Sequence, residues 1–99
     1  MVVLPALFQA LPGKEAQLEL VLKTMIPDVQ HEPGALLYAL HRATATPGSF
    51  LFFERYQDQA ALDVHAAKPY LAAMMAKTEG LLAQAPVLAH YEEVAAIQR

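Results

Sequence analysis

The sequence predicts an α+β fold in which helices cover one face of an antiparallel β-sheet. Residues 14–30 repeat apolar side chains at the spacing of an amphipathic helix. Residues 35–45 and 50–57 are typical of strands, and the turn between them carries a proline and a glycine. Pro69 is suited to the first position of a later helix. Together these patterns favour a strand hairpin that packs against helices.

Composition limits the size and setting of the protein. The chain has 99 residues, of which 56% are hydrophobic and 17% charged, and this predicts one compact domain over residues 1–99. Such a small domain buries only about 60 to 68% of its unfolded surface, so surplus apolar surface favours self-association. A net charge of −3 gives no basic surface for nucleic acid. We expect a homodimer without a nucleic-acid partner.

The expected location is the cytoplasm. The chain has no cysteine, which is compatible with a reducing compartment. Its N-terminal stretch lacks a basic segment and a small-residue cleavage site. No apolar run approaches the roughly 18 to 20 residues that a membrane span needs, so we expect no membrane partner.

The N-terminal third predicts a strand, a helix and a turn. Residues 2–11 form the strand, and we expect good pairing to begin after Pro5 or at a bulge because proline lacks a backbone N–H. Pro27 should kink or end the helix that starts near Lys14. Its buried stripe contains Leu18, Val21, Leu22, Met25 and Val29. Glu32, Pro33 and Gly34 are interpreted as a turn in which Gly34 takes a positive φ.

Residues 35–45 and 50–57 should pair as an antiparallel hairpin. Side chains alternate along a strand, which divides the second strand into two faces. One face carries Phe50, Phe52, Glu54 and Tyr56, and the other carries Leu51, Phe53 and Arg55. Neither face is wholly polar, so we expect helices on the first and a second protomer on the other.

Two helices and a strand complete the predicted fold. Asp58 stands where an N-cap would lie, before a helix from Gln59 that directs Leu62 and His65 inward. The next helix begins at Pro69, and Gly80 weakens its far end. Its buried stripe contains Leu71, Met74, Met75, Thr78 and Leu82. With a last strand over 86–97, the order matches the split βαβ, or ferredoxin-like, arrangement.

Two stretches resemble the antibiotic biosynthesis monooxygenase (ABM) domain family. The stretch "EPGALLYALHR" at 32–42 is similar to the family's E-P-G-x-x-x-Y-x-x-x-R. The stretch "ERYQDQAALDVH" at 54–65 is similar to its E-x-Y/W-x-D-x-x-A-x-x-x-H motif. The "PGK" at 12–14 lies where the family begins its first helix. The resemblance covers nearly the whole chain and implies a dimeric α+β barrel.

The resemblance also implies a reaction. Family members include cofactor-independent oxygenases that act on quinols or aromatic polyketide intermediates, haem-degrading enzymes, and isomerases of phosphorylated sugars. The Asn-Trp-His set of haem degradation cannot be carried over, because the chain has no asparagine or tryptophan and Tyr56 stands where many members have tryptophan. We expect no cofactor and no metal, since His31 and His90 show no ligand spacing.

His65 and Glu54 are the candidate catalytic residues. Histidine titrates near neutrality and serves readily as a base, and a carboxylate beside it would orient the ring and raise its basicity. The structural alternative is a half-buried histidine that hydrogen-bonds Glu54 or the backbone and fixes the helix to the sheet. Both interpretations place the side chain inward.

The candidate substrate-binding residues describe an apolar pocket with few polar groups. Its expected walls are Phe8, Phe52, Leu62, Met74 and Met75. Tyr56 and Tyr38 are either core or interface aromatics or partners of a quinol oxygen. His41 could provide a second base, but the sequence does not decide which face of its strand it occupies.

These residues predict a cofactor-independent monooxygenase. His65 would remove a phenolic proton, and the phenolate would reduce O2 directly and end as a quinone. Two alternatives remain open: a dimeric ligand-binding module without chemistry, and an isomerase of a small carbonyl compound or phosphosugar. An isomerase of a phosphosugar requires basic side chains at the pocket to bind the phosphate. The chain offers chiefly Arg42, Arg55 and Lys68.

Overall fold

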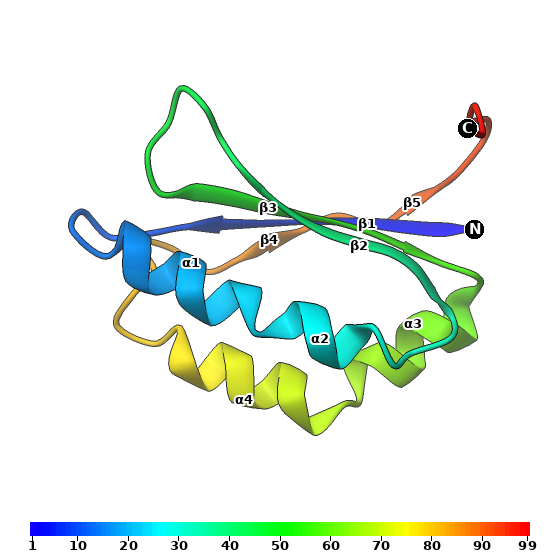
Figure 1. Ribbon diagram of the computed structural model, residues 1–99, viewed down its shortest axis with the longest axis horizontal. Helices are drawn as coiled ribbons and strands as arrows, with labels where there is room; N and C mark the ends of the chain where they lie inside the picture. Colours follow the sequence, from blue (N-terminus) through cyan, green and yellow to red (C-terminus); the bar gives the residue numbers. More distant parts are fainter.

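Helices pack on one face of an antiparallel sheet in the computed structural model, which describes residues 1–99 (Figure 1). The elements in chain order are β1 (Val2–Gln9), α1 (Glu15–Lys23), α2 (Met25–Val29), β2 (Ala35–Arg42), β3 (Ser49–Tyr56), α3 (Gln59–Ala66), α4 (Pro69–Lys77), β4 (Val87–Leu88) and β5 (Tyr91–Glu92). This arrangement confirms the predicted α+β, ferredoxin-like fold. None of the helices combines the length and the apolar character that a membrane crossing requires.

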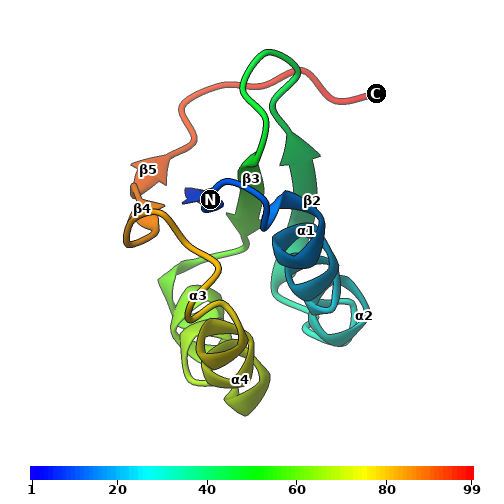
Figure 2. The same cartoon turned by 90° about the vertical axis from the view of Figure 1, so that its left-hand side faces the viewer.

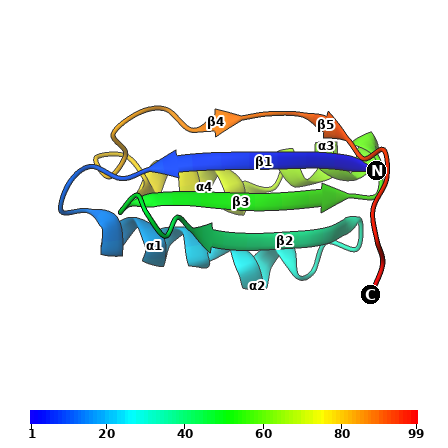
Figure 3. The same cartoon turned by 90° about the horizontal axis from the view of Figure 1, so that it is seen from above.

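The strand order is β2-β3-β1-β4, and β5 continues along the free edge of β1 (Figure 3). The β1–β3 pairing is continuous from Val2 opposite Tyr56, so the expectation that pairing begins after Pro5 or at a bulge is wrong for this edge. On the other edge, the carbonyl of Pro5 accepts from the N–H of Ala89 at 3.2 Å, but proline has no N–H to return. The expected strand over 86–97 is therefore short and divided into β4 and β5.

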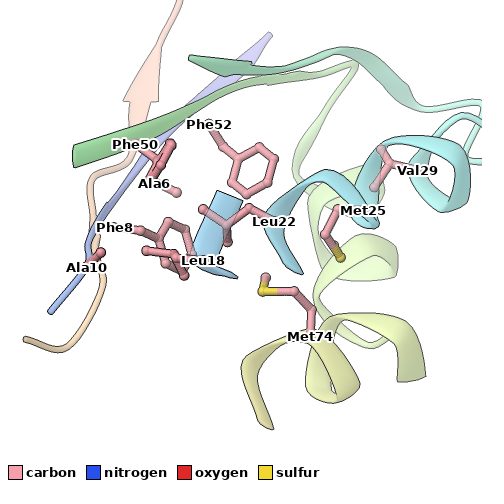
Figure 4. Close-up of a cluster of buried hydrophobic side chains, with 10 residues drawn as sticks. All are labelled: Ala6, Phe8, Ala10, Leu18, Leu22, Met25, Val29, Phe50, Phe52 and Met74. Atoms are coloured by element: carbon pink, nitrogen blue, oxygen red, sulfur yellow. The ribbon is translucent and has the colours of Figure 1, made fainter. Parts of the chain in front are cut away.

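The helical segment after β1 divides near Pro27, as predicted. α1 ends at Lys23, and the side chain of the intervening Thr24 bonds the Val21 carbonyl at 2.6 Å. Pro27 cannot donate to the carbonyl of Lys23, four residues earlier, and its ring crowds that carbonyl. The inward side chains of both helices join the main core with residues of β1, β3 and α4 (Figure 4). This core contains Ala6, Phe8, Ala10, Leu18, Leu22, Met25, Val29, Phe50, Phe52 and Met74.

β2 and β3 form the predicted antiparallel hairpin. The side chains of Phe50, Phe52, Glu54 and Tyr56 are buried on the face that the helices cover, which confirms the alternation predicted for this strand. Figures 1 and 2 place all four helices on that side of the sheet. The opposite face carries Phe53, whose exposed fraction is 37%.

Two glycine-related expectations need correction. Gly34 does not have a positive φ; the glycines that do are Gly13, Gly48 and Gly80. Gly34 is needed for space instead, because a Cβ there would lie 2.5 Å from the Cβ of Ala61 in α3. α4 ends at Lys77 and Gly80 turns the chain, so Leu82 lies outside the helix and bridges to Ala10.

Candidate active site

A cavity of about 330 Å³ lies between the helix-covered face of the sheet and helices α3 and α4. Most of its lining is apolar and comes from β1, β3, α3, α4 and the segment that leads into β4. The buried polar lining consists of Glu54 and His65, with the half-buried Tyr38 beside them. The exposed side chains of Gln59, Asp63 and His90 also line it. A small apolar cavity with few polar groups is typical of a small-molecule site.

The cavity brings together most of the residues predicted for the site. These residues are Phe8, Tyr38, Phe52, Glu54, Leu62, His65, Met74 and Met75. Tyr56 does not line it, because this side chain is fully buried and its hydroxyl donates to Glu54 Oε1 at 2.5 Å. His41 pairs with Leu51 on the uncovered face of the sheet and is exposed, so it lies away from the cavity.

His65 reaches the cavity from α3. Asp58 caps this helix, since its Oδ1 accepts from the Ala61 N–H at 2.9 Å, as the sequence predicted. His65 lies one turn after Leu62 on the buried side, with an exposed fraction of 3%. Its ring is near two tyrosine rings, with centroids 5.4 Å from Tyr38 and 5.3 Å from Tyr56. The two tyrosine rings thus form part of the surroundings of the imidazole.

The hydrogen-bond partner of His65 differs from the expected one. Its Nδ1 lies 3.0 Å from Oε2 and 3.2 Å from Oε1 of Glu32. Its Nε2 lies 3.9 Å from Oε1 of Glu54, which is close enough for charge interaction and too far for a hydrogen bond. The sequence favours Glu54 as the carboxylate that orients the ring. At this distance Glu54 makes no hydrogen bond to the ring, so it does not orient the ring in that way.

Sequence reasoning missed Glu32 and Tyr70. The sequence pattern predicts only a turn at Glu32, yet its side chain is 4% exposed and contacts His65. The Tyr70 hydroxyl, in the first turn of α4, donates to the same carboxylate. The one available signal was an acidic residue before the Pro-Gly pair, and that pattern does not tell where the side chain points.

Burial shapes the electrostatics of the cavity. Loss of water raises the pKa of Glu54 to about 7; the hydrogen bond from Tyr56 opposes this rise and the nearby Glu32 carboxylate adds to it. Burial also raises the pKa of Tyr38 above its usual value, with Glu54 and Glu32 acting in the same direction. No lysine or arginine lines the cavity. The site thus offers an imidazole, carboxylates and a neutral phenol in apolar surroundings.

Comparisons with known proteins agree with this architecture. The sequence profile of the family described as antibiotic biosynthesis monooxygenase matches residues 1–77. The structure of Rv0793 from Mycobacterium tuberculosis is similar with a TM-score of 0.90 and 26% identity, covering 98% of each chain. A proposed antibiotic biosynthesis monooxygenase from Deinococcus radiodurans has a TM-score of 0.89 and 25% identity, covering 100% of this chain and 98% of its own.

A curated relative is the uncharacterized protein sll1783 of Synechocystis. It is 34% identical over 73 residues, which is 74% of this chain. The matched region spans about half of that relative's length, 50%.

Proposed function

Because this chain belongs to the antibiotic biosynthesis monooxygenase family, we propose that it oxidises a quinol or another hydroxyaromatic small molecule with O2, without a cofactor. The observation that carries the proposal is the placement of His65. This side chain lines an apolar cavity of about 330 Å³, and its Nε2 makes no hydrogen bond to the rest of the chain. A buried imidazole nitrogen without a partner is suited to accept a proton from a bound hydroxyl.

The reaction follows from the deprotonation of the substrate. Nε2 of His65 takes the phenolic proton, and the electron-rich phenolate transfers one electron to O2. The resulting ring radical and superoxide combine to form a C–O bond, and the imidazolium returns its proton to the peroxide. Elimination of water then breaks the O–O bond and the C–H bond at the same ring carbon and leaves a quinone, so one oxygen atom ends in the product and the other in water. General-base assistance is worth on the order of 10²- to 10⁴-fold.

Glu54 is assigned an electrostatic role in this step. The imidazolium that forms after proton transfer lies 3.9 Å from Glu54 Oε1. An ionised carboxylate at about 4 Å stabilises a positive charge by roughly 4 kcal/mol at an effective dielectric constant of about 20. The surrounding walls supply apolar contacts to an aromatic ring, chiefly through Phe8, Phe52 and Met74.

The proposed assembly is a homodimer that covers the free face of the sheet. Leu37 and Phe53 on this face have exposed fractions of 39% and 37%. The Nε atom of Arg55, on the same face, is buried without a hydrogen-bond partner. A second copy of the chain would remove this apolar surface from water.

The cavity disfavours a phosphosugar isomerase. A phosphorylated ligand would meet the carboxylate of Glu54 and no lysine or arginine. Arg42 pairs with Glu19 at 2.6 Å on the surface, and Arg55 lies 3.4 Å from Glu93. Lys68 is also absent from the lining. The remaining alternative, a ligand-binding module without chemistry, is decided by the following experiment.

The test compares His65→Ala with the wild type and with Val64→Ala, a neighbouring residue of α3 whose side chain is 54% exposed and does not line the cavity. Oxygen uptake is measured with a panel of hydroquinones, and a melting curve is recorded for each protein. We expect His65→Ala to lose at least about 100-fold in turnover. His65→Ala should retain most of its stability, because Tyr70 still bonds Glu32, whereas Val64→Ala should match the wild type. Wild-type turnover in His65→Ala, or no turnover by the wild type, would overturn the proposal.

A further inference from the structure

Two side chains from separate elements, Glu32 and Tyr70, meet on the Nδ1 side of the His65 imidazole. Glu32 comes from the turn after α2, His65 from α3, and Tyr70 from the first turn of α4. Oε2 of Glu32 receives both the Tyr70 hydroxyl and the 3.0 Å contact from Nδ1. The side chains of Glu32 and His65 are each 4% exposed, so water does not compete for these bonds.

The turn that carries Glu32 is itself fixed. The Glu32 N–H donates to the Val29 carbonyl at 2.9 Å, and the Gly34 carbonyl accepts from the Gln57 N–H at 2.9 Å. Gly34 packs directly against Ala61, one helical turn before His65. The carboxylate is therefore held relative to α3 by both the backbone and the Tyr70 hydroxyl.

This geometry restricts the protonation state of the ring. A carboxylate only accepts hydrogen bonds, so the nitrogen that faces it must carry a proton. A neutral imidazole has one N–H and one lone pair, and a proton on Nδ1 leaves the lone pair on Nε2. Nε2 is the nitrogen without a hydrogen bond in the chain.

We propose that Glu32, braced by Tyr70, is a positioning residue that keeps the His65 proton on Nδ1 and thereby presents the Nε2 lone pair to the substrate hydroxyl. The effect of Glu32 on turnover rests on the proposed function, whereas its effect on the His65 tautomer does not. It assigns the orienting role to Glu32, while Glu54 keeps its role in charge stabilisation. Glu32 does not line the cavity and acts only through the imidazole.

The direct test is the imidazole ¹⁵N spectrum of the full-length protein without substrate. The wild type should show His65 with a protonated Nδ1 and an unprotonated Nε2. Glu32→Gln offers an amide NH2 that can donate to Nδ1, so it should shift the ring toward the opposite tautomer. Its kcat should fall on the order of 10²-fold or more, with KM changed less than about twofold.

Two further variants complete the design. Tyr70→Phe removes the brace and should produce a smaller shift of the same tautomer signal, and it serves as the second test if Glu32→Gln folds poorly. Glu19→Gln alters a surface carboxylate on α1 that pairs with Arg42, so the His65 spectrum and turnover should stay unchanged.

The outcomes separate this inference from the proposed function. A wild-type His65 protonated on Nε2, or a Glu32→Gln protein with wild-type tautomer and kcat, would overturn the positioning role. Wild-type protein that oxidises no hydroquinone would overturn the proposed function, while the spectrum would still decide which tautomer Glu32 imposes.

Discussion

Glu54 links the stability of the protein to its proposed chemistry. Its pKa is about 7 in the folded protein, against an ordinary value of 4.5, chiefly because the carboxyl group is buried. Between these two pH values the folded state binds a proton that the unfolded state releases. The free energy of unfolding should therefore fall as pH rises from 4.5 to 7, by on the order of 3 kcal/mol.

Glu54→Gln should remove this dependence. The amide oxygen can still accept from the Tyr56 hydroxyl, and no charge is buried above neutral pH. We expect the variant to be more stable than the wild type at about pH 8, by about 1 to 3 kcal/mol, and the difference to shrink near pH 5. Urea unfolding at the two pH values provides the measurement. Parallel loss of stability in both proteins would show that Glu54 does not titrate in this range.

The same substitution should harm turnover. Because ionised Glu54 stabilises the imidazolium, wild-type kcat should rise as pH passes through about 7, whereas Glu54→Gln should be slow and lose this rise. Oxygen uptake must be corrected with His65→Ala, since hydroquinones oxidise spontaneously more quickly at high pH. A Glu54→Gln protein with the wild-type pH profile would remove Glu54 from the reaction.

The sequence predicts individual side chains where periodicity defines their direction. His65 lies inward because Leu62, three residues earlier, marks the buried side of α3. Glu32 lies in a turn, and no periodicity describes where a turn residue points. Its partner is 33 residues away in sequence, so the contact depends on how α2, α3 and β2 pack. Strand alternation predicts the correct face of the sheet for Tyr56. Only the packing of the folded chain decides that this buried side chain is not part of the cavity lining.

At the level of elements, the turn before β2 and helix α3 are in direct contact at Gly34. A Cβ at this position would lie 2.5 Å from the Cβ of Ala61 and 3.5 Å from its Cα. Gly34→Ala should force the two elements apart and lower the free energy of unfolding by about 1 to 3 kcal/mol. It should also weaken the contact between Glu32 and His65, which a change in the His65 ¹⁵N signals would report.

A compensating variant tests the cause of this loss. Ala61→Gly removes the colliding atom and leaves the 3.5 Å contact with Cα, which is an ordinary distance. Alone it should cost roughly 1 kcal/mol, because glycine is a poor helix former. In the double variant the cost of Gly34→Ala should largely disappear. Additive losses in a double-mutant cycle would mean that the two positions do not interact.

Some helix boundaries can be predicted from the sequence because proline and capping residues mark them. Pro27 and Asp58 act within their own segment, so the break near Lys23 and the start of α3 follow from local sequence. The effect of Pro5 depends on which of its two neighbouring strands faces its missing N–H. That is set by the sheet order, which places the last strands on that edge.

At the scale of the whole molecule, the two faces of the sheet differ in whether helices cover them. The helices cover the face that carries the site (Figure 2), while the other face keeps half-buried and exposed apolar side chains. Leu51 and Phe53 belong to this second face, as β-strand alternation predicted. A domain of this size buries too little apolar surface to leave such a face exposed without cost.

The proposed homodimer can be tested by placing a charge on the free face. Light scattering should give twice the chain mass of 10.8 kDa for the wild type at micromolar concentration. Phe53→Lys should dissociate this dimer, because each copy would bury an unpaired positive charge at the interface, on the same face as Arg55. Leu20→Lys is the matched control, since Leu20 is 66% exposed and lies on α1. A monomeric wild type would contradict the dimer, and a dimeric Phe53→Lys would move its interface to another surface.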